Sequence, residues 1–126
     1  MERRARRYAS LGKAESGFRV IDGEQDGLSQ RWHHGLATVE QGEVTFVPYL
    51  GSVRFLRRAQ VQIRVTSVDR SAQRQPKGTE TFGVSSKATV IRITTPTATL
   101  EWAMSSDLVA WATRRVAGYD DTIVHE

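Results

Sequence analysis

The sequence predicts a mainly β domain, a partly open barrel of six or seven antiparallel strands capped by one C-terminal helix. Short runs of alternating apolar and polar residues recur between turn-forming residues along residues 17–104. The period then changes within residues 97–118. Leu100, Trp102 and Met104 have the spacing of a half-buried strand, whereas Leu108 and Trp111 begin the spacing of a helix. A strand that leads directly into a terminal helix predicts a curved sheet whose open end the helix closes.

Composition limits the classes of protein that the chain fits. Its 126 residues are enough for one domain with a hydrophobic core. Cysteine is absent, which excludes disulfides, zinc thiolates and a cysteine nucleophile. There is no apolar run of the roughly 18 residues that a membrane-spanning helix needs. The net charge of +4 allows contact with nucleic acid or an anionic membrane.

The chain divides into a basic leader at residues 1–16, a β domain at residues 17–118 and a polar tail at residues 119–126. Within the domain, Gln41 and Gly42 predict a two-residue hairpin turn, and Pro48 limits pairing at the end of its strand. Residues 22–27 and 69–79 are polar and predict loops. The expected strands cover residues 18–21, 31–40, 43–50, 53–56, 60–66, 87–94 and 97–104, with a further edge piece at residues 81–84.

The ends of the helix and the centre of the core also have sequence signals. Ser105 or Ser106 is expected to cap the helix start, and Gly118 suits the left-handed position that follows a helix end. Trp102, Leu108 and Trp111 are predicted to belong to the core. We expect the two tryptophans to meet where the helix closes the sheet.

The predicted strand tally followed by one helix favours the pleckstrin-homology-like superfold. A lipocalin-like barrel fits less well, because the chain is short for one. The chain also resembles the actinobacterial domain-of-unknown-function family 2550, over roughly residues 3–116. The matching pieces are the arginine run at residues 3–7, RWHHGLA at residues 31–37, the hairpin reaching residues 44–50, the basic segment at residues 54–58, the strand at residues 61–65, and LEWAMS at residues 100–105 before a tryptophan-bearing helix.

The resemblance implies a pleckstrin-homology-like domain and a location, but no chemistry, since the family has no established activity. Its members carry an N-terminal membrane helix followed by arginines. This chain opens at the arginines, so the resemblance implies either a variant without the helix or a chain that starts downstream of it.

Catalytic and metal-binding patterns are not evident, and we expect a protein that is not an enzyme and uses no cofactor. His33 and His34 are adjacent, so on a strand they face opposite sides and cannot share one metal ion. His125 lies in the polar tail, where solvation is the simpler role. The sequence has no G-x-S-x-G nucleophile motif and no phosphate-binding loop. A small hydrolase with a dispersed site is the least favoured class, and no small-molecule substrate is inferred.

Arginines form the first candidate binding surface. Arg3, Arg4, Arg6 and Arg7 are interpreted as a membrane-proximal basic patch. Each basic residue near an anionic leaflet contributes about 1 kcal/mol, so four predict useful but salt-sensitive attachment. If a membrane helix precedes them, the positive-inside rule places the domain on the cytoplasmic side. The expected partners are therefore an anionic membrane surface and a protein, which can bind beside a sheet edge and the helix.

A second set of arginines offers contacts to anions or to an acidic partner. It consists of Arg54, Arg57, Arg58 and Arg64. The alternative function is nucleic-acid binding by this basic face, extended to Arg74. It is less favoured because few aromatic side chains are interleaved with the arginines for stacking. Phosphoinositide binding at the first hairpin loop is also disfavoured, since residues 22–27 carry three carboxylates.

Overall fold

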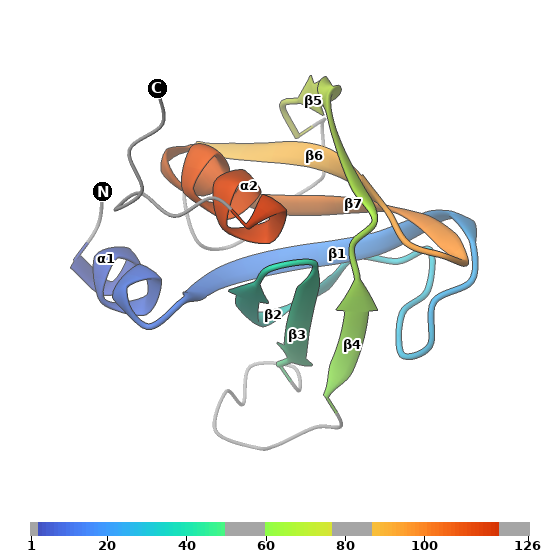
Figure 1. The fold of residues 1–126 in the computed structure, drawn as a ribbon, viewed down its shortest axis with the longest axis horizontal. Coiled ribbons are helices and arrows are strands. Elements are labelled where there is room, and N and C mark those ends of the chain that lie inside the picture. The colour runs from blue at the N-terminus through green and yellow to red at the C-terminus, as the bar shows by residue number, and fades with distance from the viewer. Residues whose placement is uncertain (1–2, 50–59, 77–86, 119–126) are drawn as a thin grey trace.

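A computed structural model of the chain describes residues 3–49, 60–76 and 87–118. Its strands form one antiparallel sheet in the order β4-β3-β2-β1-β7-β6-β5, which curls into a half-barrel (Figure 1). This confirms the predicted mainly β, partly open barrel with a C-terminal helix. The elements are α1 (Arg3–Ser10), β1 (Lys13–Gly23), β2 (His33–Glu40), β3 (Glu43–Pro48), β4 (Val61–Arg64), β5 (Ser67–Arg74), β6 (Ala88–Thr94), β7 (Ala98–Ser105), the 3-10 turn η1 (Ser106–Leu108) and α2 (Val109–Ala117).

Strand β1 joins the two halves of the sheet. Its first half pairs with β2 from Lys13 to Phe18, and its second half pairs with β7 from Gly17 to Gly23. The strand begins four residues before the predicted domain boundary at residue 17. The alternation of apolar and polar residues did not indicate this start, because Ser16 is polar yet buried. Its Oγ accepts a hydrogen bond from Trp102 Nε1 at 3.0 Å. The predicted leader therefore contributes to the sheet.

The core fills the inside of the half-barrel. Trp102 is fully buried and stacks on Phe18 with ring centroids 5.3 Å apart, and Phe18 meets Phe46 edge-on at 4.8 Å. Leu108 is 3 % exposed, whereas Trp111 is only partly buried at the margin of this core. Phe18 takes the stacking position on Trp102, and Trp111 packs against the same core cluster, so the expected contact between the two tryptophans stays a prediction.

Strand β5 corrects the prediction of a loop at residues 69–79. Residues 67–74 form an edge strand that pairs with β6, with an irregularity between Asp69 and Arg74. An exposed edge strand needs no alternating apolar pattern, which is why its polar sequence resembled a loop. The predicted strand at residues 53–56, the edge piece at residues 81–84 and the tail at residues 119–126 lie outside the described residues.

Strand β7 and helix α2 follow the predicted change of period, with two corrections. β7 lies between β1 and β6 and is buried on both faces, so Glu101 is 5 % exposed and does not face solvent. Neither Ser105 nor Ser106 caps α2; the cap position is Leu108, without a side-chain hydrogen bond. Gly118 ends the helix in the left-handed conformation, with φ 89°, as expected.

Candidate functional surfaces

Helix α1 packs against the domain and carries the N-terminal arginines on its exposed surface. Arg3, Arg4, Arg6 and Arg7 are all exposed, while Ala9 of the same helix packs against the core. Arg4 differs from the other three because its guanidinium forms a salt bridge with Glu15 at 3.2 Å. All four arginines of the predicted patch are therefore exposed, and one of them, Arg4, also ties the helix to β1.

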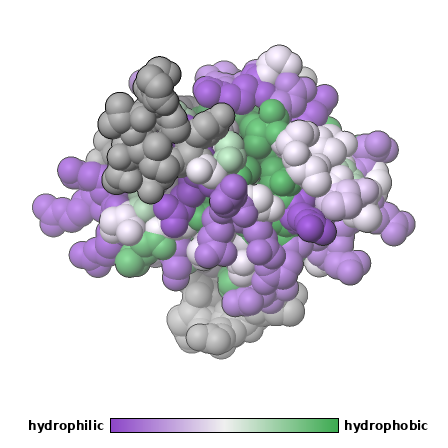
Figure 2. All heavy atoms as spheres, in the orientation of Figure 1, coloured by the Kyte–Doolittle hydropathy of each residue, from purple (hydrophilic) through white to green (hydrophobic). Residues whose placement is uncertain are grey.

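A groove of about 400 Å³ lies between α2 and the edge strand β5. Figure 2 shows hydrophobic surface between α2 and the chain that leads into β5. Two arginines lie at its margin, Arg70 on β5 and Arg114 on α2. The groove is lined by Val65, Thr66, Ser67, Val68, Arg70, Thr113, Arg114, Val116 and Ala117. The sequence predicted a groove beside the helix and a sheet edge, but β5 was not recognised as that edge.

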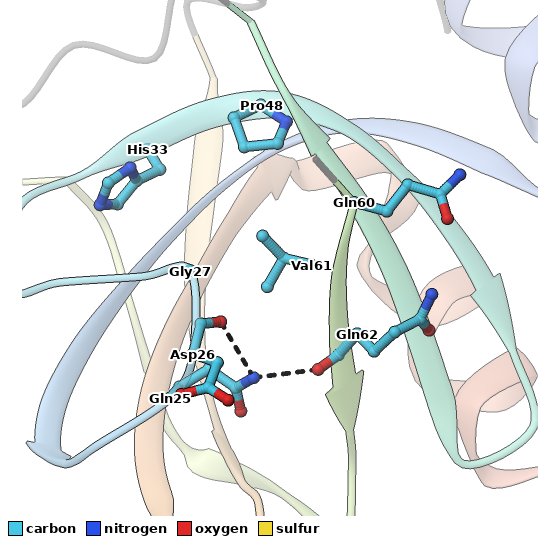
Figure 3. A pocket seen from close by; sticks show the side chains of 8 residues that line it. All are labelled: Gln25, Asp26, Gly27, His33, Pro48, Gln60, Val61 and Gln62. Atoms are coloured by element: carbon cyan, nitrogen blue, oxygen red, sulfur yellow. Dashed lines mark hydrogen bonds between the residues drawn. The ribbon is translucent and has the colours of Figure 1, made fainter. Parts of the chain in front are cut away.

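A second, polar pocket of about 600 Å³ lies where the β1–β2 loop approaches β4 (Figure 3). Gln25 Nε2 donates a hydrogen bond to the backbone oxygen of Gln62 at 2.9 Å and links the loop to the strand. His33 and Asp26 also line this pocket. Its hydrogen bonds hold the acidic loop in place, and Asp26 adds negative charge that disfavours a phosphorylated ligand.

Sequence reasoning missed a hydrogen-bonded serine and histidine in the same loop. His33 Nε2 accepts the backbone N–H of Ser29 at 3.2 Å and lies 2.9 Å from Ser29 Oγ. Which atom donates in the contact between Ser29 Oγ and His33 Nε2 depends on the tautomer of the histidine. Ser29 Oγ in turn accepts the backbone N–H of Arg31 at 3.2 Å. These local bonds close the turn before β2, and we assign the pair this structural role.

His34 lies on the next position of β2 and is partly buried. Burial, and in second place the positive charge that His33 carries when it is protonated, lower the pKa of His34 below its ordinary value. Among the described residues, no group of three or more His, Cys, Asp or Glu side chains is placed to hold a metal ion.

Glu101 is a buried carboxylate that two arginines bind within the sheet. Its Oε1 accepts from Arg19 Nε at 2.9 Å and from Arg74 Nη2 at 2.9 Å, and its Oε2 accepts from Arg74 Nε at 3.1 Å. Burial alone raises the pKa of this carboxyl, but the hydrogen bonds and charges of the two arginines outweigh it and lower the pKa. Arg19 also lies 5.1 Å from the centroid of the Trp32 ring.

This cluster changes the interpretation of the second basic set. Arg74 binds Glu101, which reduces the surface it offers to a nucleic acid. Arg64 is exposed at the end of β4, on the edge strand opposite to β5 in the sheet order. Arg54, Arg57 and Arg58 lie outside the described residues.

Comparisons with known proteins do not assign the chain to a class. No protein-family model matches it, and no curated protein or solved structure is significantly similar to it. The resemblance to family 2550 therefore stays a prediction. Over the described ranges, neither helix reaches the length and hydrophobicity of a membrane-spanning segment.

Proposed function

We propose that this protein is a non-enzymatic binding module that rests on the anionic cytoplasmic face of a membrane and binds an acidic, extended segment of a protein partner. The observation that carries the proposal is the groove between β5 and α2. The strand order and the closing helix also support the pleckstrin-homology-like class, which we propose for the domain together with the resemblance to family 2550.

The groove favours an extended peptide because one of its walls is an edge strand. Within the described ranges, β5 pairs with β6 on one side and with no strand on the other. A peptide that adds a strand there satisfies backbone donors and acceptors, and its alternate side chains reach the groove. Val68 and Val116 supply apolar contact, while Arg70 and Arg114 favour carboxylates in the partner.

Selection from a random-peptide display library tests the partner class. We expect enriched peptides to alternate apolar residues with Asp or Glu. Arg70→Glu combined with Arg114→Glu should abolish their binding by reversing the charge of the groove. Arg31→Glu combined with Arg64→Glu, which reverses two exposed arginines outside the groove, is the matched control and should bind as wild type. Enrichment of basic peptides, or equal loss in the control, contradicts the proposal.

The membrane part of the proposal is supported by the separation of charge along β1. The exposed arginines of α1 precede the strand, and Asp22, Glu24 and the rest of the acidic loop follow at its other end (Figure 1). An anionic surface attracts the first end and repels the second. An anionic membrane therefore attracts the domain and also orients it, with α1 toward the membrane and the acidic loop away from it.

Vesicle flotation at low and high salt tests this attachment. Arg3/Arg6/Arg7→Gln and Arg31/Arg64/Arg92→Gln each remove three exposed arginines, so the two variants have the same net charge. We expect only the first to lose binding to vesicles that contain phosphatidylserine, and salt to weaken the binding of wild type. Equal losses in the two variants indicate attraction by net charge alone and contradict an α1 attachment site. Binding of nucleic acid with a steep salt dependence, and of vesicles not at all, favours the alternative function.

A further inference from the structure

Leu11 is the only large hydrophobic side chain that is strongly exposed among the residues that the structure describes. It is 61 % exposed and occupies the turn between α1 and β1. Figure 2 shows a small hydrophobic area at this end of the molecule, beside the hydrophilic side chains of α1. A lone exposed leucine is ordinary on a protein surface, so its significance depends on how it is held and on what surrounds it.

Backbone hydrogen bonds fix the turn and keep Leu11 away from the core. Its N–H donates to the carbonyl of Tyr8 at 2.9 Å, and the next N–H, of Gly12, donates to Ala9 at 2.9 Å. The carbonyl of Gly12 accepts from the N–H of Val39 at 2.8 Å, which anchors the turn to β2. Gly12 has a φ of 78°, a left-handed conformation that glycine adopts without strain. The exposure of Leu11 is therefore built into the fold.

Cationic residues precede and follow this leucine in the chain. Arg3 and Arg7 precede it by eight and four residues, and this spacing places them on the same side of the helix. Lys13 follows in the chain, and the guanidinium of Arg115 lies against Gly12. An exposed leucine between basic residues of the chain matches the two layers of an anionic membrane, whose hydrocarbon lies beneath a charged headgroup region.

We propose that Leu11 inserts into the hydrocarbon of an anionic membrane while Arg3, Arg6 and Arg7 remain among the headgroups. This inference rests on the proposed membrane attachment and specifies its contact point and orientation. Insertion of the whole helix is disfavoured, because Ala9 on its apolar side packs against the core. A protein partner is disfavoured as the occupant, because one leucine is far smaller than the apolar centre of a stable interface.

Orientation follows from the length of β1. Its 11 residues extend for about 35 Å at the usual rise of a strand. When β1 stands upright on the membrane, the acidic loop that follows it lies well beyond the range of surface charges at physiological salt, which is about 8 Å. The repulsion between this loop and the membrane is consequently small when Leu11 is inserted.

The absence of cysteine in the chain allows a direct measurement of insertion. Leu11→Cys and Gln30→Cys, each labelled with an environment-sensitive fluorophore, report on the two ends of β1. With phosphatidylserine-containing vesicles, we expect a blue shift at position 11 and quenching there by nitroxide-labelled lipids. Position 30, which is exposed in the loop, should show neither change. A label at position 11 that stays in water while the protein is bound overturns the proposal.

A second variant measures what the side chain contributes. Leu11→Ser should bind the same vesicles about tenfold more weakly, because a partly buried leucine side chain is lost. Its melting temperature should match that of wild type, since the residue is exposed. If Arg3/Arg6/Arg7→Gln loses binding while Leu11→Ser binds as wild type, insertion is refuted and the membrane attachment stands. If wild type does not bind the vesicles, both proposals fail.

Discussion

Replacing Glu101 by Gln tests whether the buried carboxylate stabilises the sheet through Arg19 and Arg74. The variant keeps the shape of the side chain but removes the charge that accepts hydrogen bonds from both guanidinium groups. The new amide N–H₂ group is a hydrogen-bond donor, and it faces the guanidinium groups of Arg19 and Arg74, which are donors too. Arg74 belongs to β5 and Arg19 to β1, so the loss loosens the edge strand from the centre of the sheet.

The magnitude follows from the exposure of the three side chains. Removing one partner of a fully buried ion pair costs 3–5 kcal/mol. Glu101 is buried, but the side chains of Arg19 and Arg74 are 32 % and 21 % exposed, so water replaces part of the lost contact. We therefore expect a loss of about 3 kcal/mol in the free energy of unfolding, which lowers the melting temperature by about 10 °C for a chain of this size.

Thermal and urea unfolding, followed by circular dichroism and tryptophan fluorescence, measure this change. Arg92→Gln is the matched control, because Arg92 pairs with Glu101 across the β6–β7 ladder but its side chain is exposed. We expect the control to change stability by less than about 0.5 kcal/mol. A Glu101→Gln variant that melts within about 1 °C of wild type refutes a stabilising role for the cluster.

The difference in the free energy of unfolding between wild type and Glu101→Gln has a defined pH dependence. The folded pKa of Glu101 lies below its ordinary value of 4.5, so the unfolded chain binds the proton more readily. The carboxylate therefore contributes its full stability above about pH 5, and this contribution is lost as the pH falls through the lower folded pKa. We expect the gap in stability between wild type and Glu101→Gln to narrow below pH 4.5. A gap that widens on acidification contradicts the assigned ion pairs.

The remaining predictions concern packing and the docking of α1. Gly35→Ala should prevent folding or cost more than about 3 kcal/mol, because the added Cβ lies 2.2 Å from the backbone oxygen of Val47; an unchanged urea midpoint excludes this clash. Trp102→Ala should lose about 4 kcal/mol and Trp111→Ala about half of that, since only Trp102 is fully buried; equal losses contradict this ranking. Arg4→Gln should lower stability by less than about 1 kcal/mol but speed amide hydrogen exchange in α1, and unchanged exchange argues against the link to β1.

Particular residues show why part of the fold could be predicted from the sequence. Val61, Ile63 and Val65 alternate with polar residues and are all buried, because a strand with one solvent-facing side imposes that pattern. Gly118 is predicted for a similar reason, since its left-handed conformation is a local requirement. Such signals depend on neighbours in the chain, and they are sufficient for the closing helix and for the strands of the sheet other than β5.

The features that were missed depend on contacts between distant residues. Glu101 alternates with the apolar residues of its strand, which is the spacing of a solvent-facing position, but it is buried and bound by arginines 27 and 82 residues away in the sequence. Ser16 is buried for the same kind of reason, because its partner Trp102 lies 86 residues further along. The polar strand β5 has no apolar pattern of its own and is defined by its pairing with β6. Arg3, Arg6 and Arg7 could be predicted as a basic patch, whereas the exposure of Leu11 required the structure.

The central claim is that one surface contacts the membrane while another binds the partner, so both contacts form at once. Co-flotation of a labelled acidic peptide from the display selection with phosphatidylserine-containing vesicles tests it directly. We expect the peptide to float only when the protein is present. The variant with Arg70→Glu and Arg114→Glu should still float with the vesicles but no longer carry the peptide. With Arg3/Arg6/Arg7→Gln, neither the protein nor the peptide should float. A peptide that releases the protein from the vesicles shows that the two ligands compete for one basic surface, and it contradicts the account.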